Sequence, residues 1–391
     1  MSLNIDGNNI SDIYVGDNRI DSIYLGSNCV YSTDNYYLGF KPYNSNEVCS
    51  VKLYRYMDEG ATPSSFTSYV APTFYYSYDC KTWSSYSLGT VLQIGGNNAK
   101  AVYFKGDNLQ TWYDFYKNNE DVYLYTYINF VMTGNIKAIG DIMSLRYSNP
   151  DNSNINVIPC TYAFYSLFRD CTSLIAAPSL SATTLEASCY SSIFRGCTSL
   201  IAAPSLPATT LGASCYSAMF WNCTSLVTPP PKLPAINLSS ACYVSMFNNC
   251  TSLVIPPELP ATILTDSCYM SMFQDCTSLI TTPSLLATTL GESCYNFMFY
   301  GCTSLTQISK LPALTIPEGN ILGTYGSMFK NSSVRANDTS LDVCIYPYRI
   351  PTSDTGTCSS KALSDMFVNL DGTGSFTPTI NTEFYINVPS F

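Results

Sequence analysis

The chain has 391 residues, a formal net charge of −10 and no histidine. An acidic chain without a basic run is a poor ligand for phosphate backbones, so we expect no nucleic-acid partner. The missing histidine excludes Ser-His-Asp and Cys-His nucleophiles and every zinc site with a histidine ligand.

The composition points to a neutral polar surface. Charged residues make up 12% of the chain, about half the usual share, while tyrosine occurs 32 times. Such surfaces resemble adhesive and paratope surfaces. No apolar run approaches the ~20 residues of a membrane helix, so we expect no membrane insertion. The opening MSLNIDGNNISD lacks the regions of a signal peptide, so we expect the 17 cysteines to be made in a reducing cytoplasm, without a disulfide framework.

Residues 1–33 carry a short repeat, in which ISDIYVGDNRI is followed by IDSIYLGSNCV. Apolar residues beside Gly-Asp and Gly-Ser pairs predict small strands joined by tight turns. Such a unit is too small to bury a core alone. It is either an attachment segment or a hairpin packed on the next domain. The candidate attachment residues are Ile13, Tyr14, Ile23 and Tyr24.

Residues 34–150 contain β-branched and aromatic segments with glycines between or beside them, which predicts an all-β sandwich. Trp83 and Trp112 either form a sugar-binding platform or fill the core. The carboxylates that could serve glycan hydrolysis are Asp79, Asp107 and Asp114. Nothing in their spacing marks a pair, so we predict no enzyme, no catalytic residue and no cofactor.

Residues 151–330 repeat the tetrapeptide CTSL in steps of 26 or 27 residues, which predicts a solenoid. In one copy an apolar residue stands at every fourth position, which places these residues on one face of a helix. These residues are Leu211, Cys215, Met219 and Cys223. A proline-rich stretch follows and predicts a short strand. Each sequence repeat would then form one rung of the solenoid, made of a helix and a strand, and neighbouring rungs would stack.

The predicted fold class is therefore α+β and multidomain. It combines a small N-terminal β segment, the β-sandwich and the helix-plus-strand solenoid. Residues 331–391 keep only traces of the repeat and read as a C-terminal cap, because terminal repeats must cover an exposed core.

The paired cysteines have three possible roles. Cys215 and Cys223 lie two helical turns apart, or about 12 Å along the axis. That separation is too large for one zinc ion or one disulfide. Packing as small buried side chains is the favoured interpretation. Metal binding or disulfides between rungs stay open.

One position of the repeat changes freely among fixed neighbours, two residues before each CTSL cysteine. In a solenoid such a position forms a surface row, where extended ligands bind. The alternative is an indifferent solvent-facing position. The candidate ligand-binding residues are Arg169, Arg195, Trp221, Asn248, Gln274 and Tyr300.

The pattern CYxxMFxxCTSLxxxPxLPATTL resembles the BspA-like leucine-rich repeats, which are abundant in surface proteins of gut Bacteroidetes and in their phages. The resemblance covers roughly residues 160–330. The stretch YSYDCKTWSSYSLGTVLQIGGNNAKAVYFKG resembles the β-sandwich that often precedes these repeats. The opening IYVGDNRIDSIYLGSNCVY is similar to N-terminal segments of phage virion proteins from the same hosts.

The resemblance implies adhesion and host recognition rather than catalysis. We therefore expect a structural protein of a phage particle, a head or tail fibre or appendage made in the host cytoplasm. Its N-terminus would bind other virion proteins, and its repeats would bind a host surface glycan or protein. We also expect a homo-oligomer. The alternative is a bacterial cell-surface or secreted BspA-like adhesin.

Overall fold

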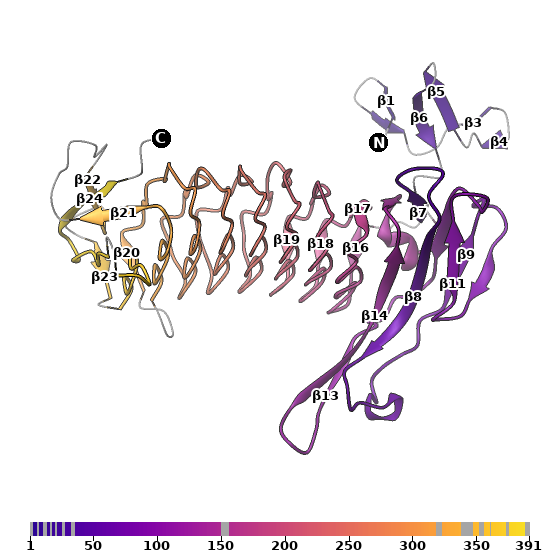
Figure 1. Ribbon diagram of the computed structural model, residues 1–391, viewed down its shortest axis with the longest axis horizontal. Helices are drawn as coiled ribbons and strands as arrows, with labels where there is room; N and C mark the ends of the chain where they lie inside the picture. Colours follow the sequence, from indigo (N-terminus) through magenta and orange to yellow (C-terminus); the bar gives the residue numbers. More distant parts are fainter. Residues whose placement is uncertain are drawn as a thin grey trace.

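Stacked loops of backbone build most of the length of this molecule, and paired β-sheets lie at one end (Figure 1). The computed structural model describes residues 3–5, 8–10, 14–15, 18–19, 22–25, 28–32, 36–149, 156–317, 323–337, 347–351, 356–359, 361–372 and 375–387. Strands make up 26% of the structure and helices 2%. The predicted α+β class is therefore wrong, and the chain is nearly all β.

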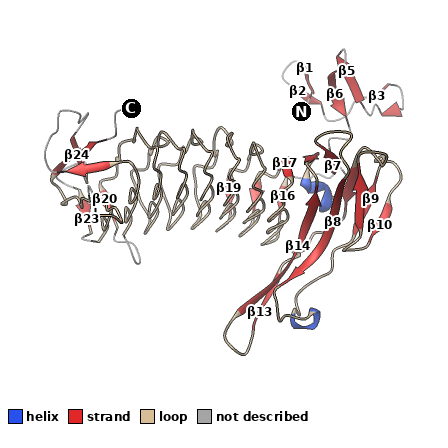
Figure 2. Ribbon diagram, viewed as in Figure 1, coloured by secondary structure: helices blue, strands red, loops and turns tan. Residues whose placement is uncertain are grey.

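Helix is confined, in these residues, to the short 3₁₀ turns η2 (Pro63–Ser65) and η3 (Ile142–Leu145) (Figure 2). The described part of the chain contains no helix of the length and hydropathy needed to cross a membrane.

The N-terminal segment forms three antiparallel hairpins. Each pairs two short strands, with Leu3 opposite Ile10, Tyr14 opposite Arg19 and Ser22 opposite Ser32. The pairs are β1 (Leu3–Ile5) with β2 (Asn8–Ile10), β3 (Tyr14–Val15) with β4 (Asn18–Arg19), and β5 (Ser22–Leu25) with β6 (Asn28–Ser32).

Two sheets form the unit that follows. One has the order β10 (Ser84–Tyr86), β9 (Phe74–Ser77), β12 (Val102–Lys105), β7 (Leu38–Pro42), β15 (Ile136–Ile139) and β17 (Leu174–Ala176). The other has the order β11 (Val91–Ile94), β8 (Cys49–Met57), β14 (Tyr123–Thr133) and β13 (Asp114–Lys117). Phe40 and Phe104 of the first sheet pack on Phe130 of the second, with ring centroids 4.8 and 5.4 Å away.

The second sheet extends beyond the first as an arm. The ends of β13 and β14 project sideways from the axis of the stacked loops (Figure 1).

The predicted helix of each rung is replaced by a turn segment with a different hydrogen-bond pattern. In the rung of residues 214–223, Tyr216 and Ala218 donate their N–H groups to Cys242 and Val244 of the next rung, at 2.9 and 2.7 Å. The residues between them donate three residues back within the rung, as Met219 does to Tyr216 at 3.2 Å. An α-helix keeps every such bond within itself. Here half of them tie the rungs together.

This pattern requires a left-handed residue at every fourth position. Ser214, Ala218 and Asn222 have φ values of 57°, 54° and 62°. Serine, asparagine and aspartate are poor helix formers because their side chains compete for backbone hydrogen bonds, and Asn and Asp tolerate positive φ. The sequence of the turn segment therefore favours this backbone over a helix.

Two aromatic ladders run through the core of the solenoid. Phenylalanine rings on successive rungs stack 5.3–5.7 Å apart and within 13° of parallel. A second ladder stacks tyrosines 5.6–6.1 Å apart after Phe164. The first comprises Phe130, Phe168, Phe194, Phe220, Phe247, Phe273, Phe299, Phe329 and Phe367, and the second continues through Tyr190, Tyr216, Tyr243, Tyr269, Tyr295 and Tyr325.

The proline-rich side of each rung pairs with its neighbours in parallel. The strands β16 (Val157–Ile158), β18 (Thr184–Leu185) and β19 (Thr210–Leu211) form one short sheet. Later rungs keep single bridges such as Ile263 with Thr289.

The sandwich continues directly into the solenoid. Strand β17 pairs in parallel with β15, and Phe130 N donates to Leu167 O at 2.8 Å. Strand β14 therefore serves as the first layer of the stack, and the buried residues form one continuous core. The predicted boundaries at residues 33, 150 and 330 stay predictions.

Small sheets lie at the other end of the stack. They comprise β20 (Thr315–Ile316) with β23 (Thr357–Cys358), and β21 (Arg335–Asn337), β24 (Glu383–Asn387) and β22 (Pro347–Arg349). Phe384 packs edge-on against Phe367, where the phenylalanine ladder ends.

Candidate recognition surface

The six varying residues of the repeat lie on consecutive rungs. The residue before each CTSL cysteine donates its N–H to the backbone carbonyl of the varying residue one rung further on. Asp170 donates in this way to Arg195 at 2.7 Å, and Gly196 donates to Trp221 at 2.8 Å. We call these residues the variable row: Arg169, Arg195, Trp221, Asn248, Gln274 and Tyr300.

Most side chains of the variable row are half-buried, and Asn248 is buried, with 7% of its surface exposed. Several also contact neighbouring rungs. The Arg195 guanidinium lies over the Trp221 ring, 4.2 Å from its centroid. Asn331 donates from Nδ2 to the Tyr300 hydroxyl at 2.8 Å. These contacts hold the row in a fixed arrangement.

A second column accompanies the row, and the sequence reasoning missed it. Because the turn segment has a period of four, the residue four positions earlier lies on the same side of the solenoid. The residue type at this position also varies from rung to rung, and that variation is the sequence signal that could identify the column. The column comprises Tyr165, Ser191, Ser217, Val244, Met270 and Asn296.

Aromatic side chains of the sandwich extend the surface. Alternate residues of β14 share one face, so Tyr123, Tyr125 and Tyr127 lie together with Asn129. Tyr56 of β8 stacks on Tyr127, with ring centroids 4.6 Å apart. We call this the tyrosine face.

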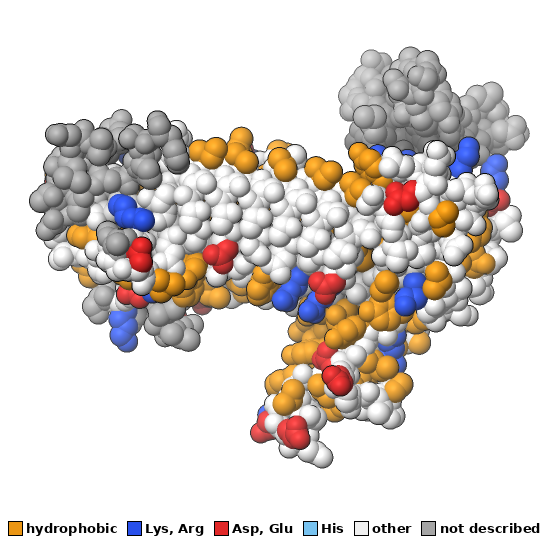
Figure 3. All heavy atoms as spheres, in the orientation of Figure 1, with side chains coloured by type: hydrophobic (Ala, Val, Ile, Leu, Met, Phe, Trp, Pro, Cys, Tyr) orange, Lys and Arg blue, Asp and Glu red, His pale blue; other side chains and the backbone are white. Residues whose placement is uncertain are grey.

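The tyrosine face and the variable row meet at the first rung. Asn129 Nδ2 donates to Arg169 O at 3.2 Å, and Arg169 Nη1 donates to the Tyr127 hydroxyl at 3.5 Å. The Tyr165 ring lies edge-on to Tyr127 at 5.5 Å. Most of the visible solenoid face carries no charge, whereas basic and acidic side chains gather where the solenoid meets the arm (Figure 3).

Burial raises the pKa of Tyr127 far above its ordinary value of 10. The same cause raises the pKa of Tyr165. Both phenols therefore stay neutral at physiological pH, and they act as hydrogen-bond partners and apolar rings rather than as bases.

The two sandwich tryptophans differ in environment. Trp112 is 6% exposed and packs against Phe74 and Phe164, so it belongs to the core. Trp83 is half-buried, with the Lys105 ammonium 4.4 Å from its ring centroid and Tyr37 beside it.

Each candidate carboxylate is bound by backbone groups around it. Asp79 accepts from the N–H groups of Lys81 and Thr82, and these bonds lower its pKa to about 2. Asp107 accepts from Ser148, and Asp114 accepts from Ser68 N at 2.9 Å. Structural roles account for all three side chains.

The candidate attachment residues fall in or beside the hairpins. Tyr14 lies in β3, and Ile23 and Tyr24 lie in β5, but the described structure does not cover their side chains. Ile13 lies outside the described residues.

The repeat cysteines form part of the core wall. Cys215 and Cys223 are both buried, and the Cys223 thiol donates to Phe194 O at 3.1 Å. The second cysteine of other rungs repeats this bond, as Cys276 does to Phe247 O at 3.0 Å. Burial raises the pKa of Cys215 to about 12, so its thiol is neutral. The repeat cysteines from Cys171 to Cys302 form no disulfide bond, and the described residues contain no metal-binding cluster.

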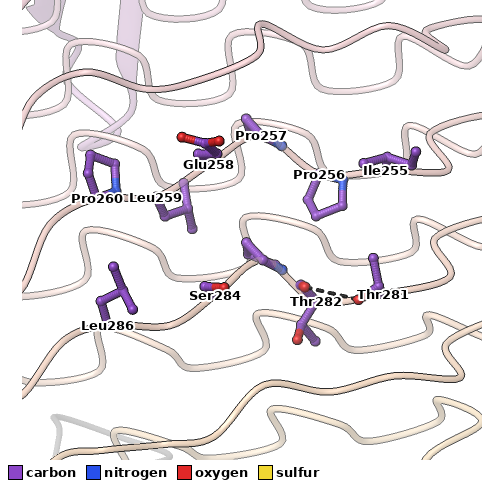
Figure 4. Close-up of a pocket in the computed structure, with 11 residues that line it drawn as sticks. Ile255, Pro256, Pro257, Glu258, Leu259, Pro260, Thr281, Thr282, Ser284 and Leu286 are labelled. Carbon is purple, nitrogen blue, oxygen red and sulfur yellow. Dashed lines mark hydrogen bonds between the residues drawn. The ribbon is translucent and has the colours of Figure 1, made fainter.

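A shallow groove of about 450 Å³ lies on the proline-rich side, between the rungs that contain Pro256 and Pro283 (Figure 4). Ile255 and Leu286 are exposed along it, at 64% and 50%, and Glu258 adds one carboxylate. The groove is separate from the variable row in the repeat.

Comparison of this chain with protein-family models, with curated proteins and with solved structures finds no match. The resemblance to BspA-like repeats therefore stays a prediction.

Proposed function

We propose that this chain is a non-enzymatic structural and recognition protein of a bacteriophage particle, a head or tail fibre or appendage. Its N-terminal hairpins attach it to other virion proteins. The variable row and the tyrosine face together bind a glycan or protein of the host surface. We also propose that copies of the chain associate with one another.

The observation that carries the proposal is the continuity of the variable row with the tyrosine face. Tyr, Trp, Arg and Asn are the residue types that dominate paratopes and binding hot spots. Here they are presented by rigid elements, because inter-rung hydrogen bonds fix each turn segment and strand pairing fixes β14. A rigid surface loses little entropy when it binds.

The hairpins support the attachment role. An isolated two-stranded hairpin is at best marginally stable in water. Three such hairpins in succession gain stability if they pair with, or pack on, another protein. This favours association with other virion proteins or with further copies of the chain.

Two experiments test the proposal. Mass spectrometry of purified particles is expected to detect the chain, and detection only on the surface of uninfected bacteria would contradict the virion assignment. Replacing Arg195, Trp221 and Tyr300 together by Ala is expected to lower binding of the full chain to host cells about tenfold or more. The matched control replaces three exposed residues of the proline-rich side, Ile236, Ile263 and Leu314, and is expected to bind normally.

A further inference from the structure

We infer that the junction of the solenoid and the sandwich holds a binding site for the carboxylate of an acidic sugar. The site comprises Arg169 and Arg195, with Tyr127, Tyr165 and Trp221 around them; we call it the arginine corner. The inference rests on the proposed function and specifies the class of host glycan.

The cations are concentrated in one place. Residues 156–317 contain four basic side chains, Arg169, Arg195, Lys232 and Lys310, and six acidic ones. The two arginines occupy the same position of the repeat. Their rungs are adjacent, as the hydrogen bond from the N–H of Asp170 to Arg195 O shows. In a chain of net charge −10, this is a local excess of positive charge.

The positive charge is only partly neutralised. Arg169 Nε lies 3.4 Å from Asp170 Oδ2, but the Asp170 side chain is 69% exposed. Arg195 forms no ion pair with any described residue, and its guanidinium rests on the Trp221 ring. Burial, and next to it the positive charge of Arg169, lower the pKa of Arg195. A bound anion would offset the repulsion between the Arg169 and Arg195 guanidinium groups.

The shape of the groups indicates which anion fits. A guanidinium binds a carboxylate through two parallel hydrogen bonds, and its planar fork is preorganised when it stacks on an aromatic ring. The Trp221 ring already holds Arg195 in this way. Partly exposed rings at Tyr165, Trp221 and Tyr56 offer apolar faces for the carbon skeleton of a sugar. Carboxylate and sugar ring are thus recognised side by side.

The test measures binding of the full chain to immobilised polymers by biolayer interferometry. The probes are polygalacturonate, polysialic acid, neutral dextran and dextran sulfate. We expect binding to at least one of the two carboxylate polymers, with little binding to dextran and weaker binding to dextran sulfate. Polygalacturonate and polysialic acid distinguish a uronate from a sialic-acid ligand. Failure to bind either of them, or tighter binding to dextran sulfate, would overturn the inference.

Variants separate the site from bulk charge. R195Q is expected to weaken binding about 10- to 100-fold, since a hydrogen-bonded charge is lost. R195K, which keeps the charge but not the planar fork, is expected to lose most of the same affinity. K310Q makes the same charge change at an exposed lysine of the solenoid and is expected to bind normally. Equal losses in K310Q and R195Q would overturn the inference.

Binding to host cells distinguishes failure of the arginine corner from failure of the proposed recognition function. If the double variant R169Q/R195Q still binds host cells as the unmodified chain does, the arginine corner is not the site and the recognition function stands. If the unmodified chain binds neither cells nor particles, the proposed function itself fails. Near-UV circular dichroism of each variant confirms that the fold is kept.

Discussion

The buried carboxyl of Asp141 makes a quantitative prediction about pH. Asp141 bridges Tyr37 of the sandwich side to Ser179 of the solenoid side and caps η3 by accepting from Met143 N at 2.8 Å. It is 8% exposed, and burial raises its pKa to about 6 despite hydrogen bonds from Met143 and Ser181. The junction therefore contains a carboxylate that is unfavourably charged at pH 7.

The sign and size of the effect follow from linkage. The native state binds this proton more tightly than the unfolded chain does, where the pKa is near 3.8. At pH 7 the charged group lowers the free energy of unfolding by about 3 kcal/mol, since one pKa unit is worth about 1.4 kcal/mol. This penalty falls as the pH drops through about 6, and it vanishes below about 4.

The variant D141N isolates this contribution from those of the other carboxylates. Its amide oxygen can keep the Met143 bond, but the side chain does not titrate. Urea unfolding at several pH values, followed by tryptophan fluorescence, should show the unmodified chain gaining up to about 3 kcal/mol relative to D141N between pH 7 and pH 4. Parallel stability curves for the two proteins would refute the reasoning.

Three further predictions concern the rungs. C223A should lower the free energy of unfolding by about 1–2 kcal/mol through lost packing, whereas EDTA should leave the melting temperature unchanged; destabilisation by EDTA would indicate a metal role instead. At Asn222, whose φ is 62°, replacement by Gly or by Val removes the hydrogen bond that Asn222 Oδ1 accepts from Asn249 Nδ2. Only Val adds backbone strain, so N222V should be less stable than N222G by about 1–2 kcal/mol, and equal melting of both variants would contradict the left-handed backbone. Y216F should be at least as stable as the unmodified chain, with a gain of up to about 1 kcal/mol in urea unfolding, because the Tyr216 hydroxyl is buried without a partner among the described residues. A clear loss of stability would show that the hydroxyl has a hydrogen-bond partner.

The sequence predicted which side chains the rungs bury, but not the backbone that buries them. Cys215, Met219 and Cys223 are all fully buried, as the every-fourth-residue stripe requires. That stripe predicts a helix, yet positions eight apart in an α-helix are rotated about 80° from each other. The constant eight-residue spacing of the buried cysteines therefore fits a backbone that repeats every four residues better than an α-helix with 3.6 residues per turn.

A second signal of the backbone also stood in the sequence. The residue before each CTSL cysteine is always Gly, Asn or Asp, the types that adopt positive φ most easily. These residues are Asp170, Gly196, Asn222, Asn249, Asp275 and Gly301. Reading that position would have predicted a left-handed residue and the end of any helix there.

The site was only partly predictable, because its two halves come from distant parts of the chain. The variable row was visible as variation at a constant phase of the repeat. The tyrosine face was not, since nothing in the sequence of β14 indicates that it stacks on the first rung.

The sequence of the first rung reflects its contact with the sandwich. Phe164 stands where later rungs have tyrosine, and besides stacking on Tyr190 of the next rung it packs against Trp112 of the sandwich at 5.5 Å. Tyr165 stands where the next two rungs have serine, and it packs against Tyr127 and Tyr113 of the sandwich. A first repeat that departs from its consensus at residues that contact the sandwich, with a ring without a hydroxyl at Phe164 and an added ring at Tyr165, indicates that its open end is covered by another aromatic layer. That layer is β14, whose Phe130 ring is parallel to Phe168 within 9° and begins the ladder. The departures of the first repeat and the position of the arginine corner therefore have one cause: the sandwich completes the stack and brings its tyrosines to the start of the variable row.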